Sequence, residues 1–349
     1  MALPASGAVR LGADVDVELN LASTTAISLG STAVRGLYGV ASGAIRLAAD
    51  GYGKLNGIDY AVYGPGYTGF SPFYNALTNR YTYSTETSAV GTSFPAIRGF
   101  TASTSSLLAG IFAGGYNGST LATSVKYTYS GDTVGSGASL NAGREYFNAS
   151  SSSTKGYYAG GFQGSYPGYS GVDLYTYSND TVAGGTSLPG GKSYHASIGN
   201  ASAGYYVGGY ASVTPALSTT IYKYLYSNDT TSTSANLSTG AGNQGGTGYN
   251  AVGVIGMGYT GTYNTNTIKY TYSTDTMAAG TNLTIAGGQS ASPATSGTSQ
   301  KGYFAASAGT ANYHSKYIYS NDTSAYATTL TGSGNKNGFS SCGSSPNGL

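Results

Sequence analysis

The sequence predicts an all-β protein, most of which forms a six-bladed β-propeller. Three observations favour this fold: one short motif recurs six times, three further strand-like segments accompany each copy, and the C-terminal segment resembles a strand that the first copy lacks. The composition agrees, because the 349 residues include 56 Gly and 35 Tyr but only 15 basic and 13 acidic side chains. Tyrosine and threonine favour strands, whereas glycine and asparagine favour turns.

The recurring motif is Tyr-x-Tyr-Ser-x-(Asp/Glu)-Thr. Its copies begin at Tyr81, Tyr127, Tyr175, Tyr224, Tyr270 and Tyr317, so successive copies are 46, 48, 49, 46 and 47 residues apart. An apolar residue follows each copy at a constant distance, at Phe94, Leu140, Leu188, Leu237, Leu283 and Leu330. Repeats of about 40–50 residues with four short strands are typical of propeller blades. Six copies therefore predict six blades.

Each repeat contains four expected strands, which we name a to d. Strand a is rich in Ala, Ser and Thr, as in residues 100–106, and strand b is aromatic and Gly-rich, as in IFAGGY at 111–116. Strand c carries the two tyrosines of the motif, which share one face because side chains alternate along a strand. Strand d ends near the apolar residue that follows each motif at a constant distance, such as Leu140. We expect strand a to be innermost, where small side chains suit the crowding.

The first repeat has no strand a before IDYAVYGPGY at 58–67. The missing strand is matched at the other end of the chain, where NKNGFSSCGSS at 335–345 is similar to IRGFTASTSS at 97–106. The C-terminus therefore supplies strand a of the first blade and closes a ring over residues 57–349. An open solenoid would need no returning strand.

Several features of the repeat resemble the kelch pattern. They are the Gly-Gly after strand b, a basic residue before strand a (Arg144, Lys192, Lys336) and the strand-c tyrosine. The kelch tryptophan is missing, since the chain has no Trp. This resemblance implies a kelch-like fold but no activity.

Residues 1–56 follow a different rhythm and are expected to form a small separate anchor. The segment resembles the N-terminal segment of tailed-bacteriophage tail proteins in DVDVEL (14–19), AVR (33–35) and GYGK (51–54). Kelch-like propellers rich in YSNDT repeats also occur in phage virion proteins. The resemblance implies a tail, baseplate or fibre protein of the virion, present in several copies. Residues 1–56 would then bind other virion proteins, and the propeller would bind host-surface polysaccharide.

Several functional classes are disfavoured by the sequence. Cys342 stands alone, which excludes an internal disulfide and a thiolate metal cluster, and no phosphate loop or other cofactor motif is present. A net charge of +2 does not indicate the basic surface of a nucleic-acid-binding protein. The chain has no run of 18 apolar residues and no continuous apolar stretch near its start, so we expect neither membrane insertion nor a signal peptide. We therefore expect no cofactor, no metal and no catalytic residue.

The titratable residues are interpreted as structural. His195 lies at the start of a strand a, where other repeats have Phe100 and Phe147, and is expected to be a packing residue, while His314 lies near the last b–c loop. The acids of the motif occur once per blade, and we expect them to stabilise the c–d turn, with calcium binding as an open alternative: Glu86, Asp132, Asp180, Asp229, Asp275 and Asp322. The other acids of this part, Asp59, Glu145 and Asp173, are expected in different blades. A glycan lyase or hydrolase with paired carboxylates is therefore disfavoured.

Recognition is expected on the rim formed by the b–c and d–a connections, because the predicted b–c loops, such as 258–268 and 308–315, vary in length while the c–d segments do not. Varied loops on a fixed scaffold commonly carry binding residues, and exposed tyrosines suit sugar rings. The predicted rim residues are Tyr67, Phe70, Tyr74, Tyr116, Tyr166, Tyr169, Tyr210, Tyr259, Tyr263, Tyr313, Arg98, Arg144, Lys192 and Lys336. Inter-blade packing by these tyrosines and basic residues is the alternative. A purely structural or decoration protein, whose propeller binds neighbouring virion proteins, is the alternative function.

Overall fold

The computed structural model describes residues 59–68, 74–106, 108–164, 168–211, 216–249, 251–284, 293–308, 311–331 and 338–343. The chain divides into two compact units, Met1–Asp59 and Tyr60–Leu349. Apart from Asp59, all described residues belong to the second unit. The predicted anchor of residues 1–56 lies outside the described residues.

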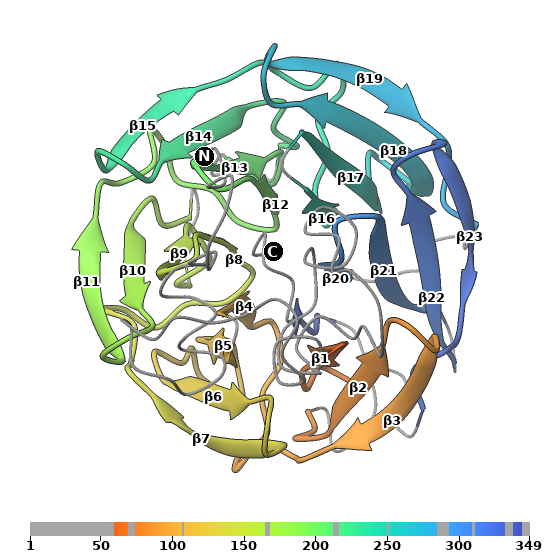
Figure 1. The fold of residues 1–349 in the computed structure, drawn as a ribbon. Helices are drawn as coiled ribbons and strands as arrows, with labels where there is room; N and C mark the ends of the chain where they lie inside the picture. Colours follow the sequence, from red (N-terminus) through yellow and green to blue (C-terminus); the bar gives the residue numbers. More distant parts are fainter. Residues whose placement is uncertain are drawn as a thin grey trace, which may run out of the picture. The chain divides into compact units, whose positions relative to one another are not determined.

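The described residues form six four-stranded antiparallel sheets, which are the blades of a propeller (Figure 1). From the centre outwards, the first three blades are β24 (Ser341–Gly343), β1 (Tyr60–Tyr63), β2 (Thr78–Thr82) and β3 (Thr87–Gly91); β4 (Ala102–Ser105), β5 (Ala109–Ala113), β6 (Ser124–Thr128) and β7 (Thr133–Gly137); and β8 (Asn148–Ser151), β9 (Lys155–Ala159), β10 (Val172–Thr176) and β11 (Thr181–Gly185). The last three are β12 (Ala196–Gly199), β13 (Ala203–Val207), β14 (Ile221–Leu225) and β15 (Thr230–Thr233); β16 (Gly245–Gly248), β17 (Val252–Tyr259), β18 (Tyr263–Thr271) and β19 (Thr276–Gly280); and β20 (Ala294–Gly297), β21 (Lys301–Ala308), β22 (Ala311–Ile318) and β23 (Thr323–Ala327).

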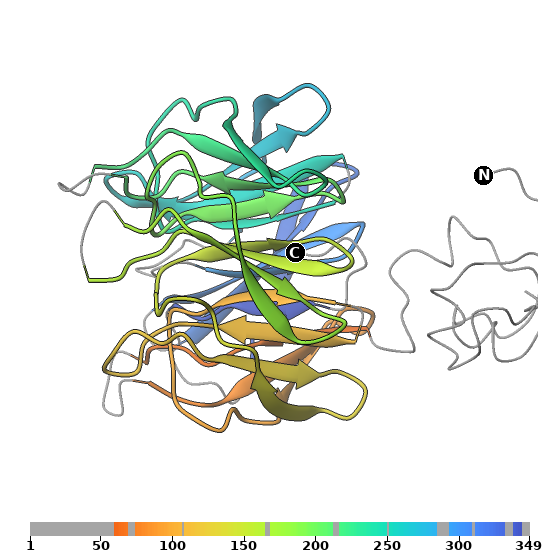
Figure 2. The same cartoon turned by 90° about the vertical axis from the view of Figure 1, so that its left-hand side faces the viewer.

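The predicted all-β, six-bladed propeller is confirmed. Each blade runs a, b, c, d from the channel outwards, and the strands cross the disc between its two faces (Figure 2). Within the part of the chain that the structure describes, no helix is long and apolar enough to cross a membrane.

The ring closes as the sequence predicts. β24 pairs antiparallel with β1, with Ala61 opposite Gly343, Val62 opposite Cys342 and Tyr63 opposite Ser341. Cys342 is fully buried, and its thiol contacts the carbonyl of Val62. One sheet thus joins the two ends of the propeller and completes the first blade, against which the sixth blade packs.

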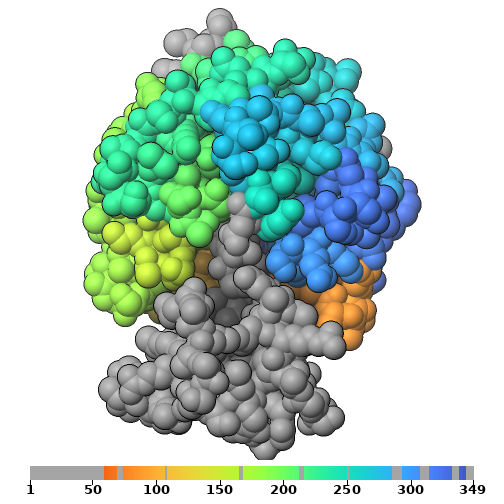
Figure 3. Space-filling model, turned by 45° about the horizontal axis from the view of Figure 1, so that its top comes forward, coloured from red at the N-terminus to blue at the C-terminus, as the bar shows by residue number. Residues whose placement is uncertain are grey.

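The tyrosines of strand c fill the space between neighbouring blades. The first tyrosine of every copy has no exposed surface, and the ring of Tyr270 in blade 5 lies 5.0 Å from that of Tyr205 in blade 4. Such ring pairs contribute about 0.5–1.5 kcal/mol beyond the burial of their surface. In the space-filling view, blades 4 to 6, coloured green to blue, lie side by side (Figure 3).

The b–c connections of blades 5 and 6 differ from the prediction. Residues 258–268 and 308–315 are predicted as loops, but β17 and β18 extend to Tyr259 and from Tyr263, and β21 and β22 are separated by two residues. Their Thr, Tyr, Ser and Ala residues pair across the hairpins, and a register shift between Gly256 and Gly258 lets the longer blade 5 hairpin form. Strand propensity therefore extends the sheets into the predicted loops.

Candidate functional site

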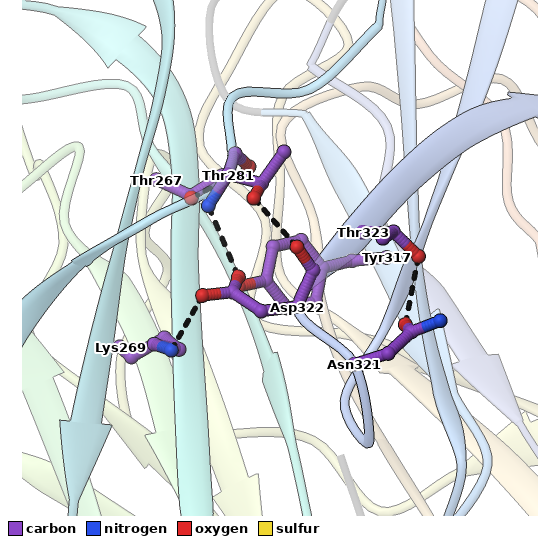
Figure 4. A network of polar contacts seen from close by, with 7 residues as sticks. All are labelled: Thr267, Lys269, Thr281, Tyr317, Asn321, Asp322 and Thr323. Carbon is purple, nitrogen blue, oxygen red and sulfur yellow. Dashed lines mark hydrogen bonds and ion pairs between the residues drawn. The ribbon is translucent and has the colours of Figure 1, made fainter.

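The acid of the repeated motif is a turn residue, as predicted. Asp322 adopts a left-handed conformation with φ of 55°, and all six motif acids have φ between 48° and 58°. Aspartate tolerates this region better than most residues because its short side chain bonds nearby backbone. Thr323 next to it donates a hydroxyl hydrogen bond of 2.7 Å to Asn321, which shapes the same turn (Figure 4).

The same acid also joins neighbouring blades, which the sequence analysis missed. Asp322 in blade 6 accepts hydrogen bonds from the hydroxyl of Tyr317, from the Thr281 amide at 3.0 Å and from the Lys269 ammonium at 2.6 Å (Figure 4). Thr281 and Lys269 belong to blade 5. Burial raises the pKa of Asp322, but these hydrogen bonds, that of Lys269 first, outweigh it and lower the pKa to about 2. The carboxylate is therefore ionised and engaged on several sides.

The ion pair between a motif acid and a basic residue of the neighbouring blade, which we call the inter-blade latch, recurs around the ring. The ion pairs are Arg80–Asp132 at 3.4 Å, Lys126–Asp180 at 3.1 Å, Lys269–Asp322 at 2.6 Å and Lys316–Glu86 at 2.6 Å. The last pair joins blade 6 to blade 1 and reinforces the closure by β24. A basic residue immediately before the motif was the available sequence signal, and it occurs in all copies except that of blade 3, where Leu174 takes its place.

Both histidines are buried structural residues. Burial lowers the pKa of His195 to about 3, with Lys192 and Arg144 adding to the effect, and lowers that of His314 to about 4. The His314 ring bonds the hydroxyl of Tyr63 at 2.8 Å. Neither imidazole reaches solvent, since each is 1% exposed.

The expectation that Glu145 and Asp173 lie in different blades is wrong. Asp173 lies on β10, and Glu145 lies three residues before β8 and pairs with Phe162 after β9, so both belong to blade 3. Their environments differ: Asp173 is paired with the Arg144 guanidinium at 2.9 Å, whereas burial raises the pKa of Glu145 to about 7. The two acids are 28 residues apart in the sequence, with strands a and b of the blade between them.

The basic residues predicted for the rim lie inside the blades. Arg98, Arg144 and Lys192 are 5%, 0% and 0% exposed. Lys192 donates to the carbonyl of Thr220 at 2.7 Å, and its ammonium lies 4.2 Å from the centroid of the Tyr222 ring. Burial lowers the pKa of Lys192 to about 7. These side chains thus anchor the d–a connector onto strands b and c of the blade it enters, and they do not contact a ligand at the surface directly.

The backbone of the rim is held rigidly. In blades 2 to 5 an aromatic residue at or just after the end of strand b exchanges two backbone hydrogen bonds of 2.7–3.1 Å with the residue three positions before strand a; the pairs are Tyr116 with Gly99, Phe162 with Glu145, Tyr210 with Ser193, and Tyr259 with Gly242. In blades 2 to 4 a Gly-Gly with positive φ precedes the aromatic, for example 68° and 114° at Gly160 and Gly161, whereas blade 5 has Met257-Gly258 at 57° and 125°. Only glycine adopts that second angle readily, which explains the repeated dipeptide.

Rim aromatics from four blades form one continuous group, which we call the aromatic belt. Neighbouring ring centroids are 4.0–5.9 Å apart along the order Tyr116, Tyr74, Tyr67, Phe100, Tyr146, Tyr194 and Tyr210. Phe100 is 9% exposed, and the six tyrosines are half-buried. Tyrosine presents an apolar face together with a hydroxyl, so the belt offers surfaces for stacking and hydrogen bonding.

Three members of the belt were missed by the sequence analysis. Phe100, Tyr146 and Tyr194 occupy one position of the repeat, just before strand a, and have φ of 58°, 53° and 54°. The predicted equivalence of Phe100 and His195 is therefore wrong, because Phe100 corresponds to Tyr194. The amide of Tyr194 donates to the carbonyl of Tyr146 at 2.7 Å across two blades. Bulky residues adopt this conformation only when their surroundings impose it, at a cost of about 1–3 kcal/mol each. Their spacings of 46 and 48, equal to the blade period, were the available signal.

The remaining predicted rim residues are divided among separate places. Tyr259 and Tyr263 contact each other at 5.2 Å on the blade 5 hairpin, and Tyr263 is exposed. Tyr169 lies against the Arg144 guanidinium at 5.1 Å. Tyr313 lies in β22 opposite Ala306, and its side chain is not described. Phe70, Tyr166 and Lys336 lie outside the described residues.

The central channel is narrow. It is lined by strand-a residues such as Ser103, Asn148, Ser197 and Thr295, and encloses about 40 Å³. A water molecule needs about 10–15 Å³ on this measure. The channel therefore has room for a few waters but not for a sugar ring.

Comparison with known proteins supports the fold. No protein-family model and no curated protein matches the sequence. Among solved structures the chain is similar to the one described as "Structure of YjhT", with a TM-score of 0.62 and 10% identity over 73% of this chain and 92% of that chain. At this identity the likeness shows the propeller fold alone.

Proposed function

We propose that this chain is a structural protein of a bacteriophage tail, baseplate or tail fibre, and that its kelch-like propeller binds a glycan of the host surface without cleaving it. The resemblance of residues 1–56 to phage tail proteins supports the virion assignment. That segment would attach the protein, in several copies, to other virion proteins.

The observation that carries the binding role is the aromatic belt. Phe100 and Tyr146 of the belt line the central channel, and Tyr116 and Tyr210 are held by paired backbone hydrogen bonds, so little conformational freedom is lost there when a ligand binds. Half-buried tyrosine rings suit the apolar faces of pyranose rings, and their hydroxyls suit sugar hydroxyls. The left-handed conformations of Phe100, Tyr146 and Tyr194 support a role beyond packing, because backbone strain concentrates at functional sites.

Binding without catalysis is supported by the state of the acids. Four motif acids are held in ion pairs between blades, and Asp173 is held by Arg144. Glycoside hydrolysis usually requires two carboxyl groups that flank the scissile bond. Acids so engaged are poorly placed to supply such a pair.

The test is binding of the fluorescently labelled full chain to a panel of bacterial strains, each compared with its derivative lacking surface polysaccharide. We expect saturable binding to at least one strain, lost with its polysaccharide and reduced about tenfold or more by Tyr74→Ala with Tyr116→Ala. Tyr326→Ala is the matched control, because Tyr326 is 65% exposed on the outer strand β23, away from the belt. Absence of binding to every strain would contradict the proposal and favour a propeller that binds only virion proteins.

A further inference from the structure

A large open groove lies where blades 4 and 5 meet, on the outer side of the disc. It encloses about 760 Å³, within the range of about 300–1,000 Å³ that is usual for ligand sites. One wall is the d–a connector between β15 and β16, and the other is formed by β18, β19 and the turns beside them. The groove is distinct from the narrow central channel, which has no lining residue in common with it.

The groove arises where blade 5 departs from the repeat. The position of Arg98, Arg144 and Lys192 recurs at intervals of 46, 48 and 49 residues, and its fourth occupant is Ala241. In blades 2 to 4 a buried cationic side chain fills this place and anchors the connector. Ala241 lines the groove and is too short to fill that place.

The partners of the missing cation have changed as well. In blade 4, Lys192 bonds Thr220 and lies against the Tyr222 ring. The residues 46 positions later, at the same place in strand c, are Asn266 and Ile268, and both line the groove. Blade 5 thus has Ala241, Asn266 and Ile268 where blade 4 has Lys192, Thr220 and Tyr222. The place that a lysine fills in blade 4 is open in blade 5 and is lined by an amide and an aliphatic side chain.

The lining is polar and nearly uncharged. Side-chain amides and hydroxyls predominate, in Asn236, Ser238, Thr239, Gln244, Thr260, Asn264, Asn266, Thr267, Thr276 and Asn282, above apolar surface from Ile268 and Met277. The one carboxylate, that of Asp275, already accepts hydrogen bonds from Ser234 and Tyr270. No Lys or Arg is among the described lining residues.

Gln244 provides an unsatisfied group at this site. It is 6% exposed, lines the groove, and its Oε1 has no hydrogen-bond partner in the part of the chain that the structure describes. A buried amide oxygen without a partner costs about 1–3 kcal/mol. This oxygen is itself covered, so it marks an unpaired polar group beside the groove and is not counted as a direct ligand contact. At the same position of the repeat, blade 3 has the apolar Phe147.

We propose that the groove between blades 4 and 5 binds a neutral oligosaccharide. Amides and hydroxyls above an aliphatic floor match a ligand with many hydroxyls and CH surfaces, and the lack of cationic residues disfavours an acidic one. The inference rests on the proposed function for the class of ligand and adds a second contact region to the aromatic belt.

The test uses the full chain on an array of neutral tetra- to hexasaccharides of glucose, galactose, mannose and rhamnose, beside oligosaccharides containing uronic or sialic acids. Ala241→Lys refills the groove with the residue that blade 4 has at this position. Asn266→Ala removes a polar group from its wall. Ser136→Lys is the matched control, because it adds the same charge to an exposed position on the outer strand of blade 2.

We expect a neutral oligosaccharide to bind the wild type with little dependence on salt, and Ala241→Lys and Asn266→Ala to weaken binding about tenfold or more. Ser136→Lys should bind like the wild type. If Ala241→Lys does not fold, Asn266→Ala still decides the matter.

The two proposals fail in different ways. Binding that is lost in Tyr74→Ala with Tyr116→Ala, but unchanged in both groove variants, overturns the groove and leaves the proposed function. Binding confined to acidic oligosaccharides would likewise overturn the groove proposal and leave the proposed function. Absence of binding to every glycan overturns both.

Discussion

Replacing His195 by phenylalanine should make the propeller less sensitive to acid. His195 is 1% exposed, its ring packs on Tyr206 with centroids 5.7 Å apart, and neither ring nitrogen has a hydrogen-bond partner in the described part of the chain. Blade 3 has Phe147 at the same position of the repeat, so an aromatic hydrocarbon ring fits this site. The substitution therefore removes a titratable group while keeping the packing.

The size of the effect follows from the pKa shift. Burial lowers the pKa of His195 to about 3, whereas the unfolded chain protonates near 6.5. The folded protein therefore binds fewer protons than the unfolded chain, and stability is lost as pH falls from about 6.5 towards 3. At pH 5 the loss from this one residue is about 1.36 × 1.5, or roughly 2 kcal/mol. His314, with a pKa lowered to about 4, adds a similar loss.

The assay is urea unfolding followed by tyrosine fluorescence at pH 7.5 and pH 5.0. We expect the free energy of unfolding to fall by about 2 kcal/mol less in His195→Phe than in the wild type between these pH values. His314→Thr, which introduces the residue found at this position in blade 5, is the companion variant and should give a similar difference. An equal loss in the wild type and His195→Phe would refute the reasoning, because the acid sensitivity would then come from other groups.

Three further predictions concern how the ring is held together. Glu86→Gln removes the pair with Lys316 between the last and first blades and should lower the free energy of unfolding by about 1 kcal/mol in urea titrations; an unchanged midpoint would show that the ion pair contributes nothing to closure. Asp322→Asn keeps a residue suited to the left-handed turn but loses the charge facing Lys269, so its cost of at most about 1 kcal/mol should shrink in 1 M NaCl, and a salt-independent cost would argue against the latch. Burial raises the pKa of the Cys342 thiol to about 12, so a thiol reagent should label it only as fast as β24 detaches; rapid labelling in the absence of denaturant would contradict the described closure.

The fold could be predicted from the sequence because every blade of a propeller has the same packing and turn requirements. Every blade must bury two faces and turn the chain at the same places, so the tyrosines of strand c and the acid of the c–d turn recur with the blade. The ring must also close, which explains why residues 338–343 resemble the strand beginning at Ala102. These features are local or repeated, and a single chain displays them several times over.

The site was less predictable because it depends on contacts between blades. The position of Arg144 and Lys192 beside variable loops suggested a surface role, but the side chains point inwards to carbonyls of strands b and c. Phe100 was assigned to the start of an inner strand and Tyr146 was given no role, whereas their left-handed backbone brings the two rings together between neighbouring blades. Side-chain direction at a connector is set by tertiary packing, which spacing alone does not contain.

The loss of a repeated residue was as informative as its presence. An alanine such as Ala241 gives no signal by itself. Only its position in the repeated series Arg98, Arg144 and Lys192 shows that a buried cation is missing there. The groove between blades 4 and 5 could therefore have been anticipated by asking which copy of the repeat lacks its anchor.

The central claim is that this propeller binds a glycan and leaves it intact. The most direct measurement is to titrate the full chain with the neutral oligosaccharide that binds best on the array, by calorimetry, and then to analyse the recovered oligosaccharide by mass spectrometry. We predict saturable binding with the oligosaccharide recovered at its original mass. Recovery of shorter fragments, or no heat of binding at any concentration, would contradict the account.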